Sequence, residues 1–112
     1  MTDFTLARLA SAFLALSALL HLVSPLTMGI QMALVMVGIA LFYAVLILLM
    51  APGRRWVGYI VWICMLAGAI GAYVSAGGSV PAWQAWAILA ADLACAATLF
   101  VWLWRRAPAE VA

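Results

Sequence analysis

The stretch MGIQMALVMVGIALFYAVLILLM, residues 28–50, decides the fold because it contains no Asp, Glu, Lys or Arg from end to end. A helix needs about 20 mostly apolar residues to cross a hydrocarbon core about 30 Å thick. One similar run precedes this stretch and two follow it. The four predicted spans are residues 6–23, 28–50, 56–76 and 82–104.

The prolines support these boundaries. Pro25, Pro52 and Pro81 each fall between two runs, and Pro108 follows the last run. A proline inside a helix removes a hydrogen bond and clashes with the preceding turn, so prolines confined to the connections favour four separate helices. Because the connections are short, we expect an all-α, integral membrane bundle of four transmembrane helices. The helices are expected to form two antiparallel helical hairpins within a single domain, residues 1–112.

The composition excludes several classes of protein. Hydrophobic residues make up 71% of the chain and charged residues only 7%, whereas soluble domains have about 25% charged residues. A net charge of +2 from dispersed arginines does not favour nucleic-acid binding. We therefore predict a small polytopic membrane protein whose first partner is the lipid bilayer.

The arginines predict an orientation. With four crossings, all five arginines fall on one face of the membrane, and both connections on the other face lack charge. The positive-inside rule places such a face in the cytoplasm. We expect a bacterial inner (plasma) membrane protein with both termini cytoplasmic, and with these residues on the inner side: Arg8, Arg54, Arg55, Arg105 and Arg106.

Small residues recur at four-residue spacing in the last two runs, where helices in lipid approach each other closely. The third run carries Gly68 and Ala72, and the fourth carries Ala87, Ala91 and Cys95. We expect these two helices to form the closest pair.

Asp92 is the leading candidate for a functional residue. It lies near the middle of the fourth run, where an aspartate costs about 2.5–3.5 kcal/mol to insert. No cation lies at the same depth, so we expect its carboxyl group to be protonated much of the time. Such a group suits a proton or substrate site. The alternative is a structural role, with a hydrogen bond to a backbone carbonyl or Thr98, or a contact with another subunit.

His21, Gln31, Tyr73 and Gln84 fall near the outer ends of their runs. They are candidates for a polar vestibule above Asp92, although polar side chains at helix ends also reach headgroups without further function. A single histidine is a poor basis for a metal site, and an interfacial histidine bonded to Ser17 or water is the simpler interpretation.

A methionine stripe in the second run has two interpretations. Met28, Met32 and Met36 follow one another at four-residue spacing. Thioethers suit Cu(I), but methionine is also an adaptable packing residue. We expect no metal site and no cofactor.

No phosphate-binding loop, metalloprotease motif or Ser-His-Asp set is present, so an enzyme is not expected. The favoured hypothesis is an accessory or scaffolding subunit of a larger membrane complex, or a homo-oligomer. The first alternative is a small proton-coupled transporter or channel that uses Asp92. The second is a protein that binds haem, pigment or copper through His21.

Overall fold

The computed structural model describes residues 2–105; Met1 and residues 106–112, which include Arg106 and Pro108, lie outside the described residues. Within that range the chain is helical and forms no strand, which confirms the all-α prediction of four helices. The elements are α1 (Asp3–Leu22), the 3₁₀ helix η1 (Ser24–Leu26), α2 (Ile30–Met50), α3 (Arg55–Ser75) and α4 (Ala82–Trp104). All four α-helices are long and apolar enough to cross a membrane, which indicates a membrane location.

Local chemistry sets the helix ends. Thr2 precedes α1, and its hydroxyl accepts a hydrogen bond from the backbone N–H of Thr5 at 3.0 Å. This cap explains why α1 begins before the predicted residue 6. Glycines make the turns after α2 and α3, because Gly53 and Gly77 have φ angles of +92° and +78°. Side chains with a Cβ atom rarely adopt this region.

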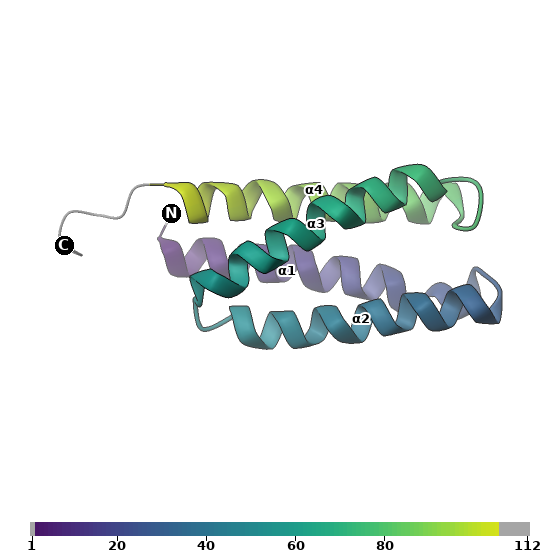
Figure 1. Ribbon diagram of the computed structural model, residues 1–112, viewed down its shortest axis with the longest axis horizontal. Coiled ribbons are helices and arrows are strands. Elements are labelled where there is room, and N and C mark those ends of the chain that lie inside the picture. The colour runs from purple at the N-terminus through teal and green to yellow at the C-terminus, as the bar shows by residue number, and fades with distance from the viewer. Residues whose placement is uncertain (1, 106–112) are drawn as a thin grey trace.

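The helices pack unequally around the bundle. Contacts are most extensive between α3 and α4 and between α4 and α1, followed by α1 and α2, whereas α2 and α3 touch sparsely. Figure 1 shows α3 starting beside the end of α2 and crossing the bundle toward the N-terminal end of α4. We call the space between α2 and α3 the α2–α3 seam.

The expected close approach of α3 and α4 is present, and one place where it occurs is near the α2–α3 connection. A Cβ atom on Gly58 would lie 2.9 Å from the Trp102 ring and 3.0 Å from the Leu103 side chain. Only a glycine lets α3 come this near to α4 without displacing the larger side chains.

The described arginines gather at one end of the bundle. Arg8 lies near the start of α1, Arg54 and Arg55 lie at the start of α3, and Arg105 follows α4. Figure 1 shows these three places at the same end. Arg54 donates a hydrogen bond to the Leu49 carbonyl at 3.0 Å, so it also caps the end of α2.

Arg55 caps α4 in the same way. Its guanidinium group donates hydrogen bonds to two carbonyls of the last turn of α4, those of Trp102 at 3.3 Å and Leu103 at 2.6 Å. A cation at the C-terminal end of a helix also interacts favourably with the helix dipole. Two of the arginines that predict the orientation, Arg54 and Arg55, therefore also cap the ends of α2 and α4.

Candidate functional site

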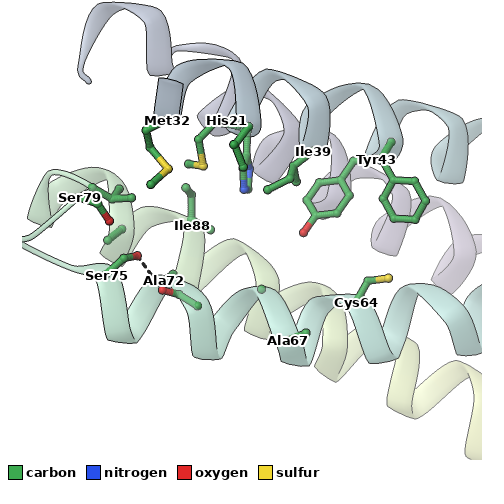
Figure 2. Close-up of a pocket in the computed structure, with 17 residues that line it drawn as sticks. His21, Met32, Ile39, Tyr43, Cys64, Ala67, Ala72, Ser75, Ser79 and Ile88 are labelled. Carbon is green, nitrogen blue, oxygen red and sulfur yellow. Dashed lines mark hydrogen bonds between the residues drawn. The ribbon is translucent and has the colours of Figure 1, made fainter. Parts of the chain in front are cut away.

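A cavity of about 450 Å³ lies in the α2–α3 seam, toward the end of the bundle that holds the α1–α2 and α3–α4 connections (Figure 2). We call it the seam cavity. Its wall is mostly apolar and contains no Asp, Glu, Lys or Arg. The lining residues are His21, Met32, Val35, Met36, Ile39, Phe42, Tyr43, Cys64, Ala67, Gly68, Gly71, Ala72, Ser75, Ser79, Val80, Ala85 and Ile88.

Asp92 is completely buried on α4, behind this wall. The Ser17 hydroxyl on α1 donates a hydrogen bond to Oδ1 of Asp92 at 2.6 Å. The other carboxyl oxygen, Oδ2, has no hydrogen-bond partner within the described range. A buried polar atom without a partner costs about 1–3 kcal/mol, so such an atom needs an explanation.

Gly68 connects the Asp92 site to the seam cavity. It lines the cavity, and a Cβ atom added to it would lie only 2.5 Å from Oδ2 of Asp92 and 3.1 Å from the hydroxyl oxygen of Tyr43. The carboxyl group and the phenol therefore both approach α3 at Gly68, a position that has no side chain. Tyr43 also lines the cavity, so Asp92 is separated from it only by a thin part of the wall.

His21 lines the seam cavity from α1, although only 5% of the residue is exposed. Its Nδ1 lies 2.7 Å from the backbone carbonyl oxygen of Ser17. A carbonyl oxygen only accepts hydrogen bonds, so Nδ1 carries the proton. In the neutral ring, Nε2 then has a free lone pair, and no hydrogen bond to it is formed by the described residues. The Tyr43 ring meets the imidazole edge-on, with centroids 5.3 Å apart.

Ser17 thus joins the two candidate residues on α1 and α4. Its carbonyl oxygen accepts from His21, and its hydroxyl donates to Asp92. The partner of Asp92 is therefore a serine on another helix, and Thr98 instead donates to the Ala94 carbonyl of its own helix at 2.9 Å.

The four residues of the predicted vestibule lie in different places. Only His21 lines the seam cavity. Gln31 is exposed in the first turn of α2, where it lines a shallow second pocket. Tyr73 is 66% exposed, and its ring contacts Trp86 with centroids 6.0 Å apart.

Gln84 is completely buried and fastens α4 to the end of α1. Its amide nitrogen donates to the Leu20 carbonyl at 2.7 Å and to the Ser24 hydroxyl at 3.2 Å, and its amide oxygen accepts from the Thr27 hydroxyl at 2.7 Å. These hydrogen bonds satisfy the amide inside the protein, so Gln84 links α4 to α1 and to the connection that follows α1.

Sequence reasoning did not select Ser17, Tyr43 or Gly68 as parts of the site. Ser17 was considered only as a neighbour of His21, and Gly68 only as a contact residue. Tyr43 had a usable signal, because it carries the sole hydroxyl group in residues 30–50.

The cavity wall also carries soft ligands. Met32 and Met36 line it together with His21, whereas Met28 is not a lining residue. Met28 packs against a cluster of buried residues that do line the cavity: Met36, Ala72, Val80, Ala85 and Ile88. No three His, Cys, Asp or Glu side chains are grouped closely enough to hold a metal ion among residues 2–105.

Comparison of the chain with protein-family models, with curated proteins and with solved structures gave no match. The class is therefore defined by the fold alone: a small four-helix protein with the dimensions and hydropathy of membrane-spanning helices.

Proposed function

We propose that this protein is a small, non-enzymatic, proton-coupled carrier, with its substrate site in the seam cavity and Asp92 as its protonation site. It would lie in the plasma membrane of a bacterium with both termini in the cytoplasm. The four apolar helices and the arginines gathered at one end support this placement.

The observation that carries the proposal is the unpartnered Oδ2 of Asp92, held against a wall residue of a cavity. Ionisable groups inside a membrane are rare, and a substrate or proton pathway is the default hypothesis for them. A protonated Asp92 is neutral and compatible with its apolar surroundings. A deprotonated Asp92 needs water or a donor at Oδ2, because an uncompensated buried charge is costly.

Coupling then follows from the position of Gly68 and Tyr43. A small displacement of either one opens Oδ2 to the cavity, because Gly68 lies directly against that atom and lines the cavity. A substrate that separates α2 from α3 would hydrate Asp92 and release its proton. The sparse α2–α3 contacts make these two helices the pair that separates most readily.

The test is proton movement in liposomes that contain the purified protein and a pH-sensitive dye. Lipophilic alcohols, amines and acids are added in turn. The Asp92→Asn variant should abolish substrate-dependent proton movement, because an amide keeps the acceptor for Ser17 but carries no exchangeable acid. The Thr98→Val variant, on the same helix, should retain it. Equal movement in Asp92→Asn and native protein, or none above empty liposomes for any compound, would contradict the carrier.

An accessory or scaffolding subunit, or a homo-oligomer, is the second candidate. A row of leucines along the outer side of α2 supports it. Leu34, Leu41 and Leu48 follow at seven-residue spacing, and each is more than 60% exposed. Native purification in mild detergent followed by mass spectrometry would identify a stable partner, and Asp92→Asn should then leave the assembly intact.

A bound haem, pigment or copper ion is the third candidate, supported by the free Nε2 of His21 at the cavity wall. The purified protein would then absorb visible light or contain metal, and His21→Ala would remove that signal. A colourless, metal-free preparation would reject this candidate.

A further inference from the structure

The strongest unexplained feature of the seam cavity is a directed hydrogen-bond acceptor in an apolar wall. The Ser17 carbonyl fixes the proton of His21 on Nδ1. The lone pair of Nε2 is therefore free and faces the cavity. Only 5% of the His21 residue is exposed, so bulk water has little access to this atom. Figure 2 shows the imidazole projecting into the space between α2 and α3.

We propose that the seam cavity binds an uncharged, mainly apolar molecule with a hydroxyl group that donates a hydrogen bond to Nε2 of His21. Lipophilic alcohols and phenols form this class. The inference names the substrate class of the proposed carrier and rests on that function for its biological meaning.

The wall selects against charge. None of its residues is Asp, Glu, Lys or Arg, and the carboxyl group of Asp92 is buried behind Gly68. A charged ligand would therefore lose its hydration without a direct counter-charge, which is costly. An apolar molecule with one hydroxyl group loses little, because Nε2 replaces the water that the hydroxyl leaves.

The volume favours an organic ligand over a metal ion. A histidine whose Nδ1 donates to a carbonyl is also the usual arrangement of a metal ligand, and Met32 and Met36 line the same cavity. However, about 450 Å³ is within the range of small-molecule sites and is far larger than one ion needs. The cavity also lies in the seam between two helices, a route by which a molecule dissolved in the bilayer reaches His21.

The experiment compares three ligands that share one apolar part: 4-octylphenol, 4-octylanisole and 4-octyl-N,N,N-trimethylanilinium. The anisole blocks the hydroxyl donor, and the anilinium adds a fixed charge. Binding is measured to the full chain in lipid nanodiscs, with empty nanodiscs as the measure of partition into lipid. Because the chain has one histidine, labelling with ¹⁵N-histidine reports only the two ring nitrogens of His21.

We expect the phenol to bind about tenfold more tightly than the anisole, the size of effect produced by one buried acceptor left unpaired. The phenol should shift the Nε2 resonance and leave Nδ1 protonated, and the anilinium should bind more weakly than the phenol. In His21→Phe, phenol and anisole should bind equally, whereas Tyr73→Phe, outside the cavity, should behave as the native protein.

Equal binding of phenol and anisole by the native protein would overturn the inference, as would tighter binding of the anilinium. A shift of Nε2 with Ag(I), used as a Cu(I) analogue, but not with the phenol would replace it with a metal site. The ligand comparison on native protein decides even if His21→Phe does not fold. If the phenol binds as expected but its addition causes no proton movement in liposomes, the proposed binding site is supported and the proposed carrier function is contradicted.

Discussion

Gly68 is the residue on which the geometry of the Asp92 site depends. Its missing side chain gives room to Oδ2 of Asp92 and to the Tyr43 hydroxyl. Because both oxygens approach the same point on α3, even one methyl group there forces at least one of them to move.

We predict that Gly68→Ala lowers the free energy of unfolding by about 1–3 kcal/mol, since a Cβ atom at 2.5 Å from Oδ2 cannot be accommodated in place. Gly71→Ala is the matched control on the same helix, because its Cβ atom meets nothing within 4 Å. It should be neutral or stabilising by up to about 1 kcal/mol. Titration with a denaturing detergent measures both, and similar values for the two variants would contradict the packing described for Gly68.

Ser17 is the second residue on which the Asp92 site depends, because its hydroxyl donates a hydrogen bond to the Asp92 carboxyl group. We predict that Ser17→Ala costs about 0.6–2 kcal/mol of stability, the range for hydrogen bonds between membrane helices. Ser11→Ala is the control, because the Ser11 hydroxyl donates only to the Ala7 carbonyl of its own helix at 2.9 Å. An equal loss of stability in Ser11→Ala and Ser17→Ala would show that the hydrogen bond between α1 and α4 adds no measurable stability.

At the scale of the elements, Gln84 joins α4 to the end of α1 and to the connection after it. The amide bonds a backbone carbonyl of α1 and the hydroxyls of Ser24 and Thr27. This link closes the bundle at the end where α2 and α3 stand apart.

We predict that Gln84→Met lowers stability by about 1–3 kcal/mol, because a side chain of similar length loses all three hydrogen bonds. Gln31→Met, at the same end but exposed, should change stability by less than about 0.5 kcal/mol. Hydrogen exchange should also become faster in the last turn of α1 for Gln84→Met only. Unchanged exchange there would show that Gln84 does not hold α1 to α4.

The helices could be predicted from sequence because span length and apolar content are local properties. Residues 28–50 predicted a helix that the structure places at Ile30–Met50, and the final span, Ala82–Trp104, has the same limits in both. The start of α1 differs because the Thr2 cap lies before the apolar run.

The candidate site was less predictable, because it depends on how helices are placed relative to one another. The position of each residue within its predicted span identifies Asp92 and His21 as candidates. The same criterion also places Gln84 and Tyr73 in the site. Gln84 turns toward Ser24 and Thr27, and Tyr73 turns outward. The seam cavity has no sequence signal, since it results from the divergence of α3 from α2.

At the scale of the whole molecule, the account depends on the direction in which the bundle crosses the membrane. The arginine-bearing end includes both chain ends of the described range and the α2–α3 connection, and the seam cavity lies toward the opposite end. With the arginine-bearing end in the cytoplasm, as proposed, the seam cavity would lie nearer the outer face of the membrane.

Labelling of single cysteines in intact spheroplasts tests this arrangement most directly. The native cysteines are first removed by Cys64→Ser and Cys95→Ala. A single cysteine is then introduced at one of two exposed residues in the connections, by Ser79→Cys or by Ala51→Cys. A membrane-impermeant maleimide should label Ser79→Cys in intact spheroplasts, but Ala51→Cys only after the membrane is permeabilised. Labelling of Ala51→Cys from outside, with Ser79→Cys protected, would contradict the orientation and the outward position of the seam cavity.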